Sequence, residues 1–366
     1  MIQVFKGVRY ARAPRFGQPV LTGLDLDEAR SIAAPQPPIY GFSYLTMNLD
    51  DDTETGEDCL RLTVYTPGTS GKRPVLVWIH GGAFIGGSGM DSWYDGTALA
   101  EEGDLVVVCV SYRLGALGFL YEPERSVQNL GIQDQCAALR WIRKHIGAFG
   151  GDPDRITVAG QSAGAYSIGC LISETREELF RKAILMSSPY FPLPRPVMRR
   201  VARVFRTCLH SDPATASVHK LLRAQLVTAR KTRLPLPFAP CGYSVTRPRR
   251  VIPGLREVWL TCMADDALAW CPIRGLVPLV TRIVFSRPMH RYAGRLRRMG
   301  VATQETVLRW LHGTTLPGDV HGLDFALLFG DWERWKDQPM AQGLTREAYD
   351  TRARLLRRRV ISFVKG

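Results

Sequence analysis

A serine stands between two glycines in the stretch VAGQSAGAYSIGC, residues 158–170. An apolar run leads to Gly160, Ser162 and Gly164, and a helix-like segment follows. A strand that reverses sharply into a helix leaves no room for side chains beside the serine and holds its hydroxyl above the sheet, next to a helix N-terminus that favours negative charge. The pattern is typical of a nucleophile elbow. A structural bend also satisfies it, so other residues must decide between the two.

Attack on a carbonyl produces an oxyanion that backbone N–H groups must stabilise. The stretch HGGAF, residues 80–84, follows a strand-like run, and its glycines let the backbone approach a substrate closely. We expect the main-chain N–H groups of Gly82, Ala83 and Ala163 to form an oxyanion hole. The alternative is an ordinary turn between a strand and a loop.

A serine hydroxyl is a weak nucleophile at neutral pH and needs a general base. His321 stands in GDVHGLDFALLFG, residues 318–330, on an expected loop before a short apolar helix. This loop position suits a base. His80 is too close to the expected oxyanion turn to serve as well, and His145 stands at the end of an expected helix, where charge pairing with the helix C-terminus explains it. Surface or packing roles are expected for His210, His219, His290 and His312.

A carboxylate must hold the imidazole in the right tautomer and stabilise its cation. The strand-like run EVWLTC, residues 257–262, leads into MADDALAW, which offers Asp265 and Asp266 at a strand end. We choose Asp266, and Asp265 is the alternative. The chain order is then Ser162, Asp266 and His321, which is the order in α/β-hydrolases.

Short β-branched runs alternate with helical periods between about residues 60 and 190, as in βα units around a mostly parallel sheet. We expect a helix over 131–153. The expected strands are 60–66, 74–80, 105–112, 155–160, 182–187 and 257–262. The fold class is therefore α/β, with a helical cap inserted between two strands of the core sheet. The expected segments are the first part of the core (1–190), a basic helical cap (191–255), and the second part of the core with a C-terminal helix (256–366).

The formal net charge of +14 is concentrated in the expected cap, where one acid, Asp212, faces thirteen basic residues. These are Arg195, Arg199, Arg200, Arg203, Arg206, Lys220, Arg223, Arg230, Lys231, Arg233, Arg247, Arg249 and Arg250. A solvated surface and a surface for an anionic substrate or partner both stay open. No basic motif with interleaved aromatic residues indicates specific nucleic-acid recognition.

The sequence gives no indication of a metal, a cofactor or a membrane span. Eight scattered cysteines lack zinc-like spacing and are expected to be reduced and buried. The longest apolar runs, such as LVVVCV at 105–110, are far shorter than the roughly 18 residues that cross a bilayer. The N-terminus has no apolar run of signal-peptide length. We expect no metal, no cofactor, no membrane partner and a cytoplasmic location.

Six longer stretches resemble, in order, the type B carboxylesterases, the family of bacterial para-nitrobenzyl esterases and cholinesterases. They are FKGVRYARAP (5–14), EDCLRLTVYTP (57–67), PVLVWIHGGAFIGGSG (74–89), VVVCVSYRLGALGFL (106–120), NLGIQDQCAALRWIRKHIGAFGGDPDRITVAGQSAGA (129–165) and VHGLDFALLFG (320–330). The resemblance implies the α/β-hydrolase fold, Ser162 as nucleophile, His321 as base and Asp266 where the family usually has Glu. It implies oxyanion donors at Gly82, Ala83 and Ala163.

The sequence departs from the family pattern at several points. Asp266 is one methylene shorter than the usual Glu, Ala83 replaces a common third Gly, and Cys59 lacks its usual upstream partner, so we expect it to be free. The shortened interval between Asp266 and His321, and the end of the sequence where members continue, predict a reduced lid and a reshaped pocket. A structural polar framework is implied for Glu57, Asp58, Arg113, Asn129 and Asp134.

Together these features predict a serine carboxylesterase that hydrolyses a small-molecule ester through an acyl-enzyme, with an anionic substrate considered. One alternative is a biosynthetic enzyme that catalyses acyl transfer, cyclisation, lactonisation or elimination; the reduced lid, Asp266 and the arginine-rich cap motivate it. A second alternative is a non-catalytic binding scaffold. The complete set of expected catalytic residues argues against that scaffold.

Overall fold

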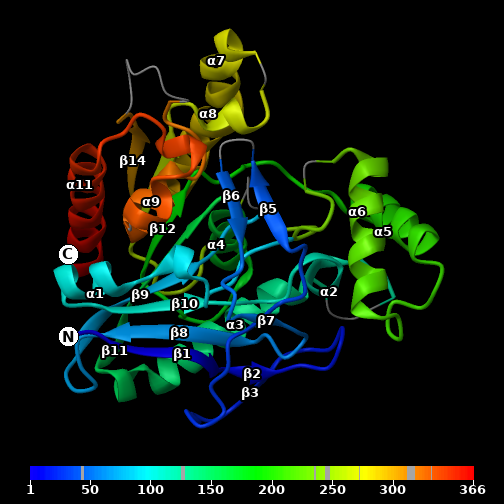
Figure 1. Ribbon diagram of the computed structural model, residues 1–366, viewed down its shortest axis with the longest axis horizontal. Coiled ribbons are helices and arrows are strands. Elements are labelled where there is room, and N and C mark those ends of the chain that lie inside the picture. The colour runs from blue at the N-terminus through cyan, green and yellow to red at the C-terminus, as the bar shows by residue number, and fades with distance from the viewer. Residues whose placement is uncertain are drawn as a thin grey trace.

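The computed structural model describes residues 1–42, 45–124, 128–234, 236–243, 248–271, 273–310, 318–330 and 332–366. Arg247 of the basic segment and His312 lie outside these ranges. Figure 1 shows a central sheet with helices around it and two helical projections, one formed by α5 and α6 and one by α7 and α8. None of the described helices combines the length and the apolarity needed to cross a bilayer.

Eight strands form the central sheet in the order β1-β8-β10-β9-β11-β12-β13-β14. From β10 to β14 all neighbours run parallel, whereas β8 is antiparallel to both β1 and β10. The strands are β1 (Gln3–Arg9), β8 (Arg61–Thr66), β9 (Arg73–Ile79), β10 (Val106–Val110), β11 (Gly151–Gln161), β12 (Lys182–Met186), β13 (Glu257–Met263) and β14 (Ala302–Leu308). This mostly parallel sheet confirms the predicted α/β class.

Six short strands pair outside the central sheet. The pairs are β2 (Ala11–Arg12) with β3 (Val20–Leu21), β4 (Ile32–Ala33) with β7 (Glu54–Thr55), and β5 (Ile39–Phe42) with β6 (Leu45–Asn48). The β5–β6 hairpin projects from the sheet and lies between the two helical projections in the view of Figure 1.

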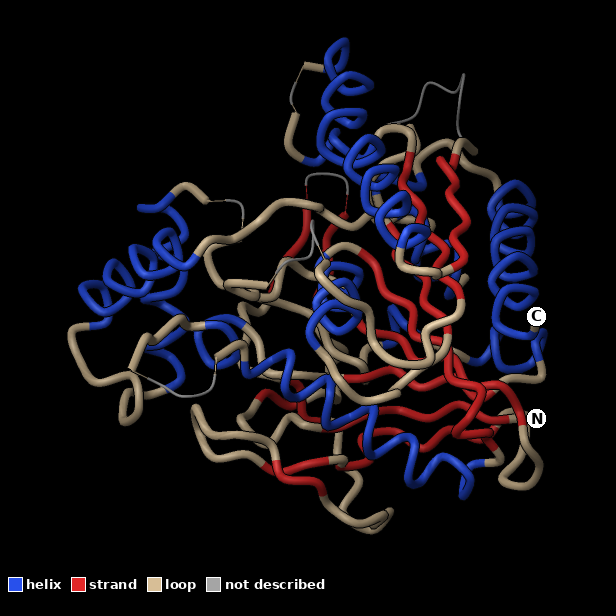
Figure 2. Tube along the Cα trace, turned by 180° about the vertical axis from the view of Figure 1, so that it is seen from behind, coloured by secondary structure: helices blue, strands red, loops and turns tan. Residues whose placement is uncertain are grey.

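Helices cover both faces of the sheet, and alternate strand residues point into two separate cores. In β9, Val75 and Val77 pack into one core, whereas Leu76 and Trp78 pack into the other. The first core contains residues of α3 (Leu130–His145), α4 (Ala163–Glu174) and α8 (Arg287–Arg298); the second contains residues of α1 (Thr97–Gly103), α9 (Leu323–Phe329) and α11 (Arg346–Lys365). Figure 2 shows α11, which ends at the C mark, beside the strands. Two covered faces explain why the central strands are apolar throughout.

Shorter helical turns complete the chain. They are η1 (Ser92–Tyr94), α2 (Gly115–Phe119), η2 (Ile146–Phe149), η3 (Asp266–Ala269), η4 (Arg274–Leu276), α7 (Val277–Thr281), the π-helical turn η5 (Arg282–Ser286), α10 (Trp332–Trp335) and η6 (Pro339–Ala341). The helix expected over 131–153 ends at His145. The chain then passes through η2 to Gly150, whose left-handed φ of 74° leads into β11.

The expected cap leaves the sheet after β12 and returns at β13, which are neighbours. Two helices, α5 (Arg195–Leu209) and α6 (Val218–Thr232), pack against each other there and project from the sheet (Figure 1). Both helices lie within the segment 191–255, which the sequence predicts to be a helical cap. The division of the chain into three segments stays a prediction.

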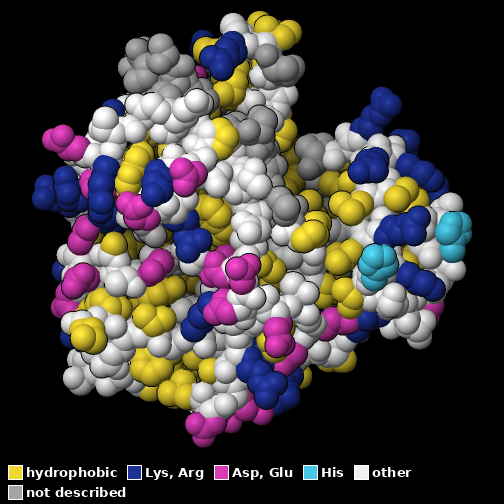
Figure 3. Space-filling model, in the orientation of Figure 1, with side chains coloured by type: hydrophobic (Ala, Val, Ile, Leu, Met, Phe, Trp, Pro, Cys, Tyr) yellow, Lys and Arg dark blue, Asp and Glu magenta, His cyan; other side chains and the backbone are white. Residues whose placement is uncertain are grey.

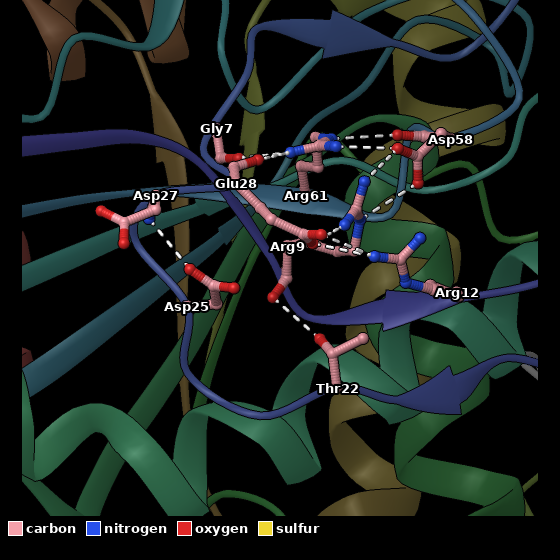
Figure 4. A network of polar contacts seen from close by, with 9 residues as sticks. All are labelled: Gly7, Arg9, Arg12, Thr22, Asp25, Asp27, Glu28, Asp58 and Arg61. Atoms are coloured by element: carbon pink, nitrogen blue, oxygen red, sulfur yellow. Dashed lines mark hydrogen bonds and ion pairs between the residues drawn. The ribbon is translucent and has the colours of Figure 1, made fainter.

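A buried arginine ties the N-terminal strands to the sheet (Figure 4). The fully buried side chain of Arg61 donates to the carbonyl oxygens of Gly7 and Glu28 at 3.0 and 2.7 Å and to Asp58 Oδ2 at 2.8 Å. Arg9 contacts the carboxylates of Asp58 and Glu28. Partial burial opposes ionisation of Asp58, but the hydrogen bonds from Arg9 and Arg61 outweigh it and lower the carboxyl pKa. Asp58 is therefore part of a polar framework.

Two other framework residues form a buried ion pair. Arg113 donates to both carboxylate oxygens of Asp134, at 2.8 and 2.7 Å. Asn129 exchanges two hydrogen bonds with the backbone of Cys241, at 2.9 and 2.8 Å. The first contact joins residues 21 positions apart and the second joins residues 112 positions apart. Arg113, Asp134 and Asn129 therefore have structural roles.

The cysteines are single thiols. All eight lie within the described ranges, and no disulfide joins any of them. Cys59 is fully buried, and burial is the main cause that raises the pKa of its thiol to about 12. The expectation that Cys59 is free is confirmed.

Arg61→Met should lower the free energy of unfolding by about 2–4 kcal/mol, because it removes the buried donor to Asp58 and to the carbonyl oxygens of Gly7 and Glu28, while Asp58 keeps its contact with Arg9. Urea unfolding followed by tryptophan fluorescence measures this change. The matched control is Arg12→Met, since Arg12 is exposed and contacts Glu28 of the same network. A control loss above about 0.5 kcal/mol would show that the network, rather than burial, determines the effect.

Candidate active site

Ser162 lies at the junction of β11 and α4 in a strained backbone conformation, with φ 55° and ψ −117°. Its N–H donates to the carbonyl oxygen of Met186 at 2.9 Å. A Cβ added at Gly160 or Gly164 would lie 2.7 or 2.0 Å from the carbonyl oxygen of Ile79. The two glycines are therefore required because the elbow packs directly on the end of β9.

Of the two candidate carboxylates, Asp266 contacts the histidine. His321 Nδ1 donates to Asp266 Oδ1 at 2.7 Å, and the N–H of Met263 donates to the other oxygen at 2.7 Å. Both side chains are buried. Asp265 instead accepts from the backbone N–H of Asp319 at 3.0 Å. The end of β13 thus presents one aspartate to the imidazole and uses the other to hold the loop.

The side chain of Gln161 contacts the other nitrogen of the imidazole. Gln161 Nε2 lies 3.1 Å from His321 Nε2. An amide nitrogen only donates, so Nε2 is the acceptor and Nδ1 carries the proton given to Asp266. Gln161 is not among the site residues predicted from the sequence, although its place directly before Ser162 puts it at the same cavity.

Two aromatic rings also pack on His321. The ring centroids of Trp270 and Phe285 lie 5.0 and 5.7 Å from that of the imidazole. Both rings come from the segment after β13, and no local motif near His321 indicates them. Both rings pack against the imidazole, which is buried.

The loop after β9 is held in a strained conformation by a buried anchor. Ala83 and Phe84 have φ values of 54° and 63°, which are unusual for residues other than glycine. Phe84 is fully buried, packs edge-on against Phe119 at 4.9 Å, and accepts the N–H of Gly115 at 2.7 Å. These contacts compensate for the backbone strain.

The three residues expected to donate to an oxyanion lie on this loop and at the start of α4. Gly82 and Ala83 line the same cavity as Ser162, and within the described ranges their N–H groups have no acceptor. Ala163 is the first residue of α4, where an N–H has no partner inside the helix. Two of the expected donors thus share a cavity with Ser162 and the third follows it directly in the chain; the oxyanion hole stays a prediction.

The cavity above Ser162 has a volume of about 460 Å³, within the range of small-molecule sites. Its apolar walls include Leu45, Met47, Ile85, Pro189, Phe191, Leu236, Ala267, Trp270, Val280, Val284, Phe285 and Phe325. The polar side chains are those of Tyr94, Gln161, Ser162 and His321. No Lys, Arg, Asp or Glu belongs to the lining that the structure describes.

A second buried aspartate lies near the catalytic candidates. Asp324 accepts from Ser187 Oγ at 3.1 Å and from the N–H of Phe325 at 2.9 Å. Burial, followed by the charge of Asp266, raises its pKa to about 7, and His321 partly offsets this. Asp324 stands three residues after His321, at the start of a short apolar helix. This spacing could have indicated from the sequence that Asp324 lies near the imidazole, but Asp324 is not among the predicted site residues.

His80 is excluded as an alternative base by its position. It is fully buried and stacked on Tyr112, with ring centroids 4.5 Å apart, and it is not part of the described cavity lining. Burial lowers the pKa of His80 to about 4. The ring is therefore neutral at neutral pH, and its role is to pack against Tyr112 at the start of the loop that follows β9.

The model of the carboxylesterase family matches residues 1–236, well over half of the chain. The chain belongs to the carboxylesterase family. This carboxylesterase is 34% identical over 94% of its length to a probable N-octanoylanthranilate hydrolase of Rhodococcus erythropolis, of which the match covers 85%. It is 31% identical over its full length to phenmedipham hydrolase of Pseudarthrobacter oxydans, of which 86% is covered.

Solved structures agree with the sequence comparison. A thermophilic PNB esterase superposes with a TM-score of 0.84 at 26% identity, covering 100% of this carboxylesterase and 87% of that chain. The type B carboxylesterase resemblance and the α/β-hydrolase fold are thereby confirmed. The protein is a carboxylic ester hydrolase.

Asp324→Asn should remove a pH dependence of stability. With its pKa raised from 3.8 to about 7, the native carboxyl keeps a proton that the unfolded chain releases. Native protein then binds more protons between about pH 4 and pH 7, so the free energy of unfolding falls as pH rises through this window. We expect Asp324→Asn to reduce that fall by roughly 2–4 kcal/mol.

Urea unfolding at several pH values measures the slope. Ser187→Ala is the control, because it removes a hydrogen bond to Asp324 but keeps the titrating carboxyl, so its slope should persist. An Asp324→Asn slope equal to that of the wild type would contradict the assignment.

Proposed function

We propose that this carboxylesterase hydrolyses esters through an acyl-enzyme, with Ser162 as nucleophile, His321 as general base and Asp266 as the carboxylate that orients the base. One observation carries the proposal: His321 donates to Asp266 at 2.7 Å, while its ring and Ser162 border one apolar cavity. The Gln161 contact supports the tautomer a base needs, because Nε2 accepts in it and is therefore the unprotonated nitrogen.

In the first half-reaction Ser162 Oγ attacks the ester carbonyl carbon and passes its proton to His321 Nε2. The carbonyl oxygen becomes an oxyanion that the N–H groups of Gly82, Ala83 and Ala163 stabilise, each worth roughly two to three powers of ten in rate. Asp266 stabilises the imidazolium. The intermediate then expels the alcohol, which takes the proton from Nε2 and leaves Ser162 acylated.

In the second half-reaction water replaces the alcohol. His321 Nε2 accepts a proton from the water as it attacks the acyl carbon, and the same N–H groups hold the second oxyanion. Collapse releases the carboxylic acid and returns the proton to Ser162 Oγ. No metal or cofactor takes part in this scheme.

The cavity lining favours neutral apolar esters over anionic ones. Phe191 and Leu236 are its lining residues from the basic segment 191–255, and no basic side chain belongs to the described lining. An unpaired carboxylate there would lose its hydration without gaining a counter-charge. The relative from Rhodococcus erythropolis is named for N-octanoylanthranilate. The octanoyl chain of that compound suits these walls, whereas its anthranilate part carries a carboxylate and does not favour the neutral class.

Ser162→Ala should reduce kcat/KM for para-nitrophenyl butyrate by about three to six powers of ten, because the catalytic groups act as a unit. Fluorophosphonate labelling of the wild type should be lost in parallel. Ser173→Ala, on the same helix α4 and also buried, is the control and should keep both properties. Serine-independent turnover, or labelling that survives in Ser162→Ala, would refute the assignment.

Substrate charge is tested with the mono-para-nitrophenyl ester of adipic acid and the methyl ester of the same compound, which has nearly the same length but no charge. We expect kcat/KM to be at least about tenfold higher for the methyl ester. Arg199→Gln combined with Arg203→Gln should leave KM unchanged for both compounds. A preference for the charged compound that this double variant abolishes would instead establish an anionic substrate.

A further inference from the structure

Apolar side chains gather on the outside of the projection formed by residues 270–298, here called the arm. Within the described ranges, twelve large hydrophobic residues are exposed, and five of them lie in the arm, with 44% to 59% of their surfaces in contact with solvent. They are Trp270, Ile273, Leu276, Leu279 and Ile283. Exposed apolar residues that cluster in this way indicate an interaction surface.

The arm presents three faces through α7 and the π-helical turn η5. Val277 and Phe285 are buried, Val284 lines the catalytic cavity, and Leu279 and Ile283 face solvent. A π-turn widens the helix by one residue and is frequent at functional sites. Because Leu279 and Ile283 belong neither to the core nor to the described cavity lining, neither is required to build them.

The arm is strongly basic as well as apolar. Between residues 267 and 304 the sequence contains no Asp or Glu. Its arginines are Arg274, Arg282, Arg287, Arg291, Arg295, Arg297 and Arg298. Within the described ranges, exposed Arg274, Arg282, Arg287 and Arg291 form no ion pair. Figure 3 shows hydrophobic side chains next to Lys and Arg at the tip of this projection.

We propose that the arm docks this protein onto an anionic lipid surface. Arginines flanking exposed Leu, Ile and Trp are the combination that holds a helix in the plane of a membrane interface: the apolar side chains enter the acyl boundary and the cations meet the lipid phosphates. A second copy of the chain is a poor partner for this surface, because two identical arms would bring like charges together.

The docking surface continues into the catalytic cavity. Trp270 is exposed on the arm and also lines the cavity. Val280 and Val284 of the neighbouring turns line the cavity beside it. An apolar ester dissolved in the lipid can therefore reach Ser162 along apolar side chains. The expectation of no membrane partner rested on the absence of a spanning segment, and docking from one side needs none.

Cosedimentation with unilamellar vesicles tests the proposal. The wild-type protein should bind equimolar phosphatidylglycerol and phosphatidylcholine at low salt and bind phosphatidylcholine alone at least about tenfold more weakly. Leu279→Ser with Ile283→Ser should weaken binding to the anionic vesicles about tenfold, and Arg274→Gln with Arg282→Gln should do the same. Docking is measured without substrate, so it stands apart from the catalytic proposal.

The matched controls lie on α11, which is also basic: Leu355→Ser, and Arg354→Gln with Arg358→Gln, all at exposed positions. They should bind the vesicles within about twofold of the wild type. All variants should hydrolyse soluble para-nitrophenyl butyrate like the wild type, so a loss of vesicle binding cannot be confused with a loss of catalysis.

Four results would overturn the proposal. The first is no preference for anionic vesicles at low salt, and the second is equal losses in the arm and α11 variants. The third is a loss confined to the arginine variant, which would indicate an acidic protein partner. The fourth is a dimer, seen by analytical ultracentrifugation, that Leu279→Ser with Ile283→Ser dissolves while vesicle binding persists.

Discussion

The contact on which the active site depends is the packing of the nucleophile elbow on the end of β9. The carbonyl oxygen of Ile79 occupies the space that side chains at Gly160 and Gly164 would need. Gly81 is equally close to the backbone of the elbow, since its Cβ would lie 2.9 Å from the carbonyl oxygen of Gln161. Backbone contacts therefore fix Ser162 relative to the loop that follows β9. The strained backbone conformations of both lie at the ends of strands of the central sheet.

Around this backbone contact the site is buried and lined mainly by apolar side chains. His321 and Asp266 are buried together, Trp270 and Phe285 cover the imidazole, and the pKa of Asp324 is raised to about 7. In such surroundings electrostatic interactions are stronger than in water. The positive charge that develops on the His321 imidazole is therefore stabilised mainly by the carboxylate of Asp266. The same apolar lining suits apolar esters.

The parts of the site that follow strand ends could be predicted from the sequence, because short motifs determine them. Ser162, Gly82 and Asp266 each stand directly after an apolar run, and parallel strands bring their carboxyl ends to one edge. The contacts of Trp270 and Phe285 with His321 could not be predicted, since tertiary packing creates them. The arm gave no local motif either; its meaning depends on which of its side chains the fold leaves exposed.

The π-helical turn of the arm separates two properties that usually constrain each other. Ile283 faces solvent and its neighbour Val284 faces the cavity, so a change at one position leaves the other environment untouched. Natural variation can therefore alter where the protein resides without altering what its cavity accepts. An engineer can likewise redesign the outer side chains, for solubility or for attachment to a support, and keep the selectivity of the walls.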